Sequence, residues 1–98
     1  MLVSNDPRVD KEIRSLDKKD NSRVVKLIEL FQDYGFVLTE PYLKKLRVNL
    51  WELRSGRWRL LLGTVKDKAI IVDIFSKKTQ KTPKKKIEKA LRRLKEYS

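Results

Sequence analysis

The sequence predicts an α+β fold in which two N-terminal helices and one C-terminal helix pack on an antiparallel sheet of three to four strands. Two stretches with helical periodicity precede Gly35, and a third follows Pro83. Between them, short runs rich in leucine, isoleucine, valine and tryptophan are separated by turn residues. The 98 residues, 40% of them hydrophobic, fit one compact domain, which we expect to span residues 1–98.

The two N-terminal helices are expected to form an αα-hairpin. Asp6 is a suitable N-cap with Pro7 in the first helical position. The apolar residues that follow at helical spacing are Val9, Ile13 and Leu16. Residues 17–21 form a predicted polar break. The second apolar face consists of Val24, Leu27, Ile28, Phe31 and Tyr34. Gly35 suits the C′ position that ends this helix.

Three strands are predicted at residues 50–54, 57–65 and 69–76, joined by turns at Ser55-Gly56 and at residues 66–68. The last helix is predicted from Thr82 as N-cap and Pro83 in the first position. Its apolar face consists of Ile87, Ala90, Leu91 and Leu94. Lysine and arginine occupy its other face.

Positive charge is concentrated toward the C-terminus. Residues 1–43 contain seven Lys/Arg against eight Asp/Glu, whereas residues 44–74 contain eight against three and residues 75–98 ten against two, within a net charge of +12. Clustered cations bind phosphates largely by releasing condensed counterions. The asymmetry therefore predicts a polyanionic partner, either a nucleic acid or an acidic protein surface.

The composition restricts the available chemistry. The chain has no cysteine and no histidine, which excludes disulfides, thiolate chemistry and the commonest general base and metal ligands. Catalysis would have to use arginine, lysine, tyrosine or carboxylates, and we expect no metal site and no cofactor. No run approaches the roughly 20 apolar residues that cross a bilayer, and the N-terminus lacks a secretory pattern. We therefore expect a cytoplasmic protein with no membrane partner.

Arginines gather on one face of the predicted ribbon. A two-residue turn at Ser55-Gly56 places Arg54 opposite Arg57 and Glu52 opposite Arg59. The core face then carries Trp51, Leu53, Trp58, Leu60 and Leu62, and the other face carries Glu52, Arg54, Arg57, Arg59 and Leu61. Like charges opposite one another destabilise a ribbon, so this arrangement indicates a phosphate site. An ordinary solvated face with a Glu52–Arg59 pair is the open alternative.

Lysines crowd the start of the last helix, where the helix macrodipole opposes them by roughly 0.3 to 1 kcal/mol each. They are Lys84, Lys85 and Lys86, and the cluster extends upstream to Lys77, Lys78 and Lys81. A bound phosphate would turn this arrangement into an anion site, and salt-screened surface charge is the alternative. Phe75 is a candidate for stacking a base, whereas Trp51 and Trp58 are expected in the core and Asp73 as a structural acid.

Three strings of residues carry a resemblance to a known family. They are residues 40–46 (EPYLKKL), 50–54 (LWELR) and 75–83 (FSKKTQKTP). Together with the order of elements, these strings resemble the RelE/HigB superfamily of bacterial toxins, in particular its phage-encoded HigB-like branch. The resemblance covers nearly the whole chain, from the αα-hairpin to the final helix, and implies a RelE-like fold.

The resemblance implies a ribosome-dependent mRNA endonuclease that pairs with a small DNA-binding antitoxin. In that metal-independent mechanism, the ribose 2′-OH attacks the adjacent phosphate and leaves a 2′,3′-cyclic phosphate and a free 5′-hydroxyl. Arg59 and Lys78 match the phosphate-stabilising cations, and Arg54 matches a basic position. The candidate catalytic residues are Arg54, Arg59, Lys77, Lys78 and Glu52. The candidate RNA-binding residues are Arg57, Phe75, Lys81, Lys84, Lys85 and Lys86.

The chain also departs from the family pattern. Relatives often place a tyrosine or histidine as base or acid near the end of the third strand or the start of the last helix, and this chain has neither there. Glu52, Lys77 or orientation on the ribosome therefore stay open as ways to achieve proton transfer. Relatives usually begin with a strand, for which residues 1–5 are barely long enough. A non-catalytic RNA- or ribosome-binding module and a ParE-type gyrase inhibitor are the alternatives, and the basic segment favours RNA. The outer surface of the αα-hairpin and the sheet edge are both open as the antitoxin dock.

Overall fold

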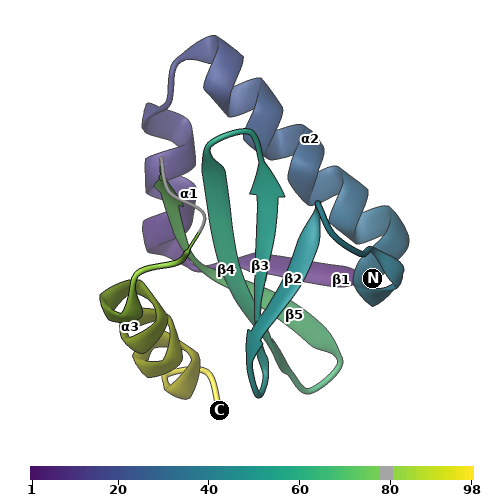
Figure 1. The fold of residues 1–98 in the computed structure, drawn as a ribbon, viewed down its shortest axis with the longest axis vertical. Coiled ribbons are helices and arrows are strands. Elements are labelled where there is room, and N and C mark those ends of the chain that lie inside the picture. Colours follow the sequence, from purple (N-terminus) through teal and green to yellow (C-terminus); the bar gives the residue numbers. More distant parts are fainter. Residues whose placement is uncertain (78–80) are drawn as a thin grey trace.

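The computed structural model describes residues 1–77 and 81–98, and it contains five strands, three α-helices and one 3₁₀ helix within them (Figure 1). The elements are β1 (Leu2–Asn5), α1 (Pro7–Ser15), α2 (Lys18–Tyr34), η1 (Gly35–Val37), β2 (Leu43–Arg47), β3 (Leu50–Ser55), β4 (Trp58–Val65), β5 (Lys68–Ser76) and α3 (Lys84–Lys95). Across the described parts of the chain, no helix is both long and apolar enough to cross a bilayer.

The strands form a single mixed sheet in the order β1-β5-β4-β3-β2. β1 runs parallel to β5, and every other pair is antiparallel. The α+β class is confirmed, but the expected sheet of three to four antiparallel strands is wrong. Periodicity missed β2 because three of its five residues are cations, which suits an edge strand that faces water. β1 has only four residues, so its identity depends on pairing with β5.

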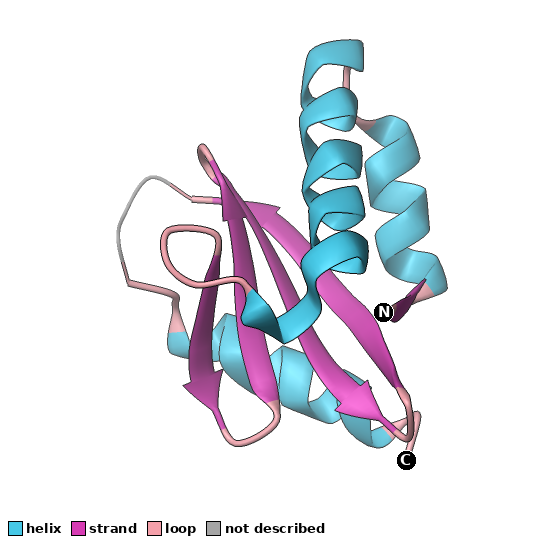
Figure 2. Cartoon of the chain, turned by 90° about the vertical axis from the view of Figure 1, so that its right-hand side faces the viewer, coloured by secondary structure: helices cyan, strands magenta, loops and turns pink. Residues whose placement is uncertain are grey.

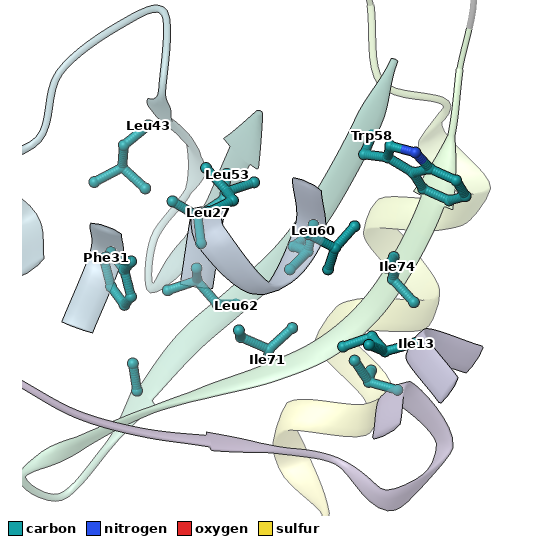
Figure 3. Close-up of a cluster of buried hydrophobic side chains, with 13 residues drawn as sticks. Ile13, Leu27, Phe31, Leu43, Leu53, Trp58, Leu60, Leu62, Ile71 and Ile74 are labelled. Carbon is teal, nitrogen blue, oxygen red and sulfur yellow. The ribbon is translucent and has the colours of Figure 1, made fainter. Parts of the chain in front are cut away.

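Helices cover both faces of the sheet, with α1 and α2 on one face and α3 on the other (Figures 1 and 2). The larger core cluster lies under α1 and α2 and includes Val24, Leu27, Phe31, Leu53, Trp58, Leu60 and Leu62 (Figure 3). The smaller one lies under α3 and includes Leu50, Leu61, Val72, Phe75, Ile87, Ala90 and Leu94. The central strands β3, β4 and β5 therefore bury most of both faces, whereas the edge strands β1 and β2 do not.

The αα-hairpin forms as predicted at its start but not at its middle. Asp6 caps α1 by accepting from the backbone N–H of Arg8 at 2.8 Å. The polar break expected at residues 17–21 is wrong, because Asp17 caps α2 by accepting from the N–H of Asp20 and the helix begins at Lys18. Gly35 ends α2 with φ +56°, as expected of a glycine at that position.

The β3–β4 turn is displaced by one residue from the predicted position. Gly56 and Arg57 form the turn, so that Arg54 pairs with Arg59 and Ser55 with Trp58. Gly56 has φ +56° and takes the first central position, which is where a type II′ turn places glycine. The predicted pairing of Arg54 with Arg57 is therefore wrong. The paired residues keep their predicted faces, because moving the centre of the turn by one residue shifts the pairing by two. Arg57, which lies in the turn, is the exception.

Candidate nucleic-acid interface

A buried carboxylate lies at the centre of the predicted catalytic residues. Glu52 of β3 is fully buried. The Nε of Arg54 donates to its Oε1 at 2.8 Å, and the Nε of Arg59 lies 3.8 Å from the same oxygen. Alternation along two paired strands places these three side chains on one face of the sheet, the face that α3 covers.

The segments on either side of residues 78–80 complete this arrangement. Thr82, which precedes α3, donates its hydroxyl to Oε2 of Glu52. Lys77, which follows β5, donates from Nζ to the Thr82 hydroxyl at 3.2 Å. We name Arg54, Arg59 and Lys77 the cation cluster. Three cations surround one carboxylate, which leaves an excess of positive charge in a poorly solvated place.

The pKa values of Lys77 and Arg59 are both lowered, as expected where positive charges are buried close together. Burial lowers the pKa of Lys77, the charges of Arg59, Arg54 and Lys44 lower it further, and the charge of Glu52 opposes the shift. Burial also lowers the pKa of Arg59, with a contribution from Arg54 and again an opposing one from Glu52. An anion bound beside these groups would offset their repulsion, so the cluster is suited to a phosphate.

Two adjoining concavities open beside the cation cluster. The larger, which we name the basic groove, measures about 550 Å³ and lies between β2 and the start of α3. Its basic lining residues are Lys44, Lys45, Arg47, Arg54, Lys81 and Lys84. The smaller, the arginine depression, measures about 270 Å³ and is lined by residues that include Tyr42, Arg54, Ser55 and Arg59. Arg54 lines both, so the two concavities meet at the cluster.

The structure brings together most, but not all, of the predicted site. Glu52, Arg54, Arg59 and Lys77 converge, and Lys81 and Lys84 line the basic groove. Lys78 lies outside the described residues. Among the residues that are described, no group of three or more His, Cys, Asp or Glu side chains is placed to hold a metal ion.

Arg57 does not join the cluster. It lies in the β3–β4 turn, where its guanidinium is 3.3 Å from Oδ2 of Asp20 on α2 and 5.6 Å from the ring centroid of Trp58. The Nε1 of Trp58 donates to the other oxygen of Asp20, and this bond, followed by the charge of Arg57, lowers the pKa of Asp20. The predicted convergence of Arg57 with Arg54 and Arg59 is wrong, because the turn directs Arg57 toward α2.

Phe75 and the helix lysines also differ from expectation. Phe75 is buried beneath α3, and the Nζ of Lys86 lies 5.0 Å from its ring centroid, which leaves little of the ring for stacking a base. Lys86 is also 4.0 Å from Asp73, the expected structural acid, while Lys85 is exposed. The prediction that Trp58 belongs to the core is confirmed, whereas Trp51 is partly buried and packs against the same core cluster.

Sequence reasoning missed three residues of the site. Thr82 was expected to cap the last helix, but the helix begins at Lys84 with Pro83 as N-cap, so the Thr82 hydroxyl is available to Glu52. Lys44 pairs opposite Glu52 in a strand that periodicity did not detect. Tyr42 is half-exposed and lines the arginine depression with Arg54 and Arg59. It belongs to the string of residues 40–46 but was not among the predicted site residues.

Comparison with known proteins identifies the sequence family of the chain and several structures with a similar fold. The sequence model of a family described as "Phage derived protein Gp49-like (DUF891)" matches residues 11–95. No curated protein sequence matches the chain significantly. The isolated RelE toxin of E. coli is similar in structure, with a TM-score of 0.63 and 12% identity over 95% of this chain and 97% of that one.

Two archaeal complexes are similar as well. The RelE–RelB complex from Pyrococcus horikoshii OT3 matches with a TM-score of 0.61 and 18% identity over 76% of this chain and 92% of the other. The RelB–RelE antitoxin–toxin complex from Methanococcus jannaschii matches with a TM-score of 0.59 and 17% identity over 78% and 89% of the respective chains. At these identities the likeness is one of fold.

Proposed function

The chain belongs to the phage-derived Gp49-like family and has the fold of the RelE toxins, and from this premise we propose that it is the toxin of a toxin–antitoxin pair that cuts mRNA on the ribosome. The similar archaeal structures are complexes of RelE with RelB, which supports an antitoxin as the partner. That this antitoxin is a small, DNA-binding protein is implied by the family resemblance alone. Activity on ribosomes would place the protein in the cytoplasm.

The cation cluster is the observation that carries the proposal. In the proposed reaction the ribose 2′-OH attacks the adjacent phosphorus in line, the bond to the 5′-oxygen breaks, and a 2′,3′-cyclic phosphate and a 5′-hydroxyl result without a metal ion. Negative charge builds up on the phosphorane oxygens. Arg54 and Arg59, which are largely buried, would stabilise that charge where water screens it little.

Glu52 is better suited to positioning these cations than to proton transfer. One of its oxygens accepts from Arg54 and the other from Thr82, and the side chain is fully buried. Lys77 is the better candidate for the proton carrier, because its lowered pKa increases the share of neutral amine near neutral pH. Tyr42 and the basic groove would hold the flanking nucleotides.

Two arginines that are two residues apart provide the test. Purified wild-type protein, Arg59→Ala and Arg57→Ala would be mixed with programmed ribosomes, and cleavage would be followed by primer extension. We expect Arg59→Ala to lower the single-turnover rate by about 10²-fold to 10³-fold, as removal of a transition-state donor does elsewhere. Arg57→Ala should stay near the wild-type rate. Circular dichroism would establish that both variants are folded.

Equal losses in the two variants would contradict the assignment of the site. Protection of the mRNA by wild-type protein, without cleavage, would instead favour the non-catalytic ribosome-binding module. Neither result would affect the family membership, because the same fold serves both activities.

A further inference from the structure

A second cavity has no member of the cation cluster among its lining residues, and of those residues only Tyr42 has a role in the proposed cleavage. This α2 cleft measures about 750 Å³ and lies between α2 and the ends of β2 and β3. In Figure 1, α2 passes the start of β2 and the tip of the β3–β4 hairpin. The side chain of Arg23 reaches across to the hairpin, since a Cβ at Gly56 would lie 2.5 Å from its Nη1.

The rim of the α2 cleft is basic. Its cations are Lys18, Lys19, Arg23 and Lys26, all on α2. No aspartate or glutamate is among its lining residues, and within residues 1–77 and 81–98 none of the four forms an ion pair of 4 Å or less. The neighbouring Arg57, by contrast, is paired with Asp20. Arg23 also interacts at longer range with Asp20, since its charge helps to lower the pKa of that carboxyl. The rim therefore presents positive charge that no close ion pair offsets among the described residues.

The floor of the cleft is apolar. Leu27 and Leu30 follow each other at i, i+3 along α2, and the half-exposed ring of Tyr42 closes the opposite side. Lys19, Arg23 and Lys26 flank this floor at i, i+4 and i+7, so they share one side of the helix. An apolar strip bordered by cations complements an amphipathic segment with leucine-like side chains on one face and carboxylates beside them. Nucleic acid fits less well, because bases stack on aromatic rings and only one lines the cleft.

We propose that the α2 cleft binds an acidic amphipathic segment of the antitoxin. The inference rests on the proposed function for the identity of the partner, and on the cleft alone for its chemistry. Tyr42 and Ser55 line both the α2 cleft and the arginine depression. A segment bound in the cleft would thus cover Tyr42 and obstruct RNA beside Arg54 and Arg59, so that docking and inhibition are coupled.

A designed peptide tests the chemistry of the cleft. The probe is a labelled synthetic helix with leucines along one face and glutamates beside them, and its control is a scrambled peptide of the same composition. Fluorescence anisotropy would compare the wild-type chain with Lys19→Glu/Lys26→Glu and with Lys11→Glu/Arg92→Glu, a matched charge reversal at sites elsewhere on the chain. We expect the first variant to bind the probe about tenfold more weakly and the second to bind it as the wild type does. Equal affinity for the scrambled peptide, or equal losses in both variants, would overturn the proposal.

The ribosome assay separates this inference from the proposed function. Lys19→Glu/Lys26→Glu should cleave as the wild type does, and the peptide should inhibit the wild type but not this variant. If the variant loses cleavage or affinity for a single-stranded RNA, the cleft is an RNA surface and the inference fails. If wild-type protein does not cleave at all, the proposed function fails while the peptide measurement still decides the chemistry of the cleft.

Discussion

At the scale of single residues, the site depends on one buried acid, Glu52, that lies among cations. A carboxylate as deeply buried as Glu52 is tolerated only where hydrogen bonds and opposite charges replace water. Arg54 and Thr82 satisfy its two oxygens, and Thr82 in turn accepts from Lys77. Glu52 thereby sets the positions of groups from β3, β5 and the segment before α3.

The pH dependence of the proposed cleavage tests the proposed role of Lys77 as proton carrier. The amine must be neutral to accept the 2′-OH proton, and burial and the nearby arginines lower its pKa. The single-turnover rate should therefore rise about tenfold per pH unit up to that lowered pKa and then level off. Lys77→Arg keeps the positive charge but stays protonated, so it should lose both the rate and the rising limb. A rising limb that persists in Lys77→Arg would assign the proton transfer to another group.

At the scale of elements, α3 is held over the sheet at several points. Asp73 of β5 is buried beneath it with Lys86, Lys89 and Arg93 at 3.6 to 4.0 Å. Arg93 also donates to the Val72 carbonyl at 2.7 Å. Beyond the end of the helix, the Tyr97 hydroxyl donates to Asp6 at 2.6 Å. Because Thr82 closely precedes this helix, the same contacts help to keep its hydroxyl against Glu52.

Removing the Tyr97 hydroxyl tests this attachment. Burial, the hydrogen bond to Asp6 and the charge of Asp6 raise the pKa of Tyr97 to about 12. A phenol whose pKa is higher in the folded state stabilises the fold while it is protonated, and this contribution is lost as the pH rises from about 10 to about 12.

Tyr97→Phe should thus lower the free energy of unfolding by about 1 kcal/mol at pH 7 in urea titrations. The difference from the wild type should shrink above about pH 10. A difference that is constant with pH would show that the hydroxyl bond does not contribute.

At the scale of the whole molecule, positive charge lies on both sides of the β3–β4 hairpin. The basic groove on the α3 side and the α2 cleft present it in two settings, one beside buried arginines and one around an apolar floor. The composition left a nucleic acid and an acidic protein surface open as alternative partners, and the two proposals above would place one on each of these surfaces. The net charge of +12 would accelerate encounter with either.

The salt dependence of RNA binding tests the division. Removing one cation that neutralises a phosphate should reduce the slope of log affinity against log salt by about 0.7 for a single strand. We expect that reduction for Lys84→Ala, which removes a cation of the basic groove, in anisotropy titrations with a labelled single-stranded RNA. Lys11→Ala, on the opposite face of the sheet, should keep the wild-type slope. Equal slopes in all three proteins would mean that RNA binds elsewhere.

Much of the molecule follows from local sequence. Asp6 with Pro7 starts α1 and Gly35 ends α2, because caps act through neighbouring backbone groups. Strict alternation places Glu52, Arg54 and Arg59 on one face whichever two-residue turn joins the strands. The excess of lysine and arginine in the second half of the chain predicts a polyanionic partner, and this prediction does not depend on the fold.

The tertiary structure alone decided the rest. The turn at Gly56 removed Arg57 from the cluster, because the register depends on backbone conformation at one residue and on Asp20 of α2. Pairing with distant partners made strands of β1 and β2, and packing of α3 brought Thr82 and Lys77 to Glu52. The α2 cleft likewise exists only where a helix passes two strand ends. Periodicity and capping are encoded within a few neighbouring residues, whereas contacts between segments far apart in the chain form only when the core packs.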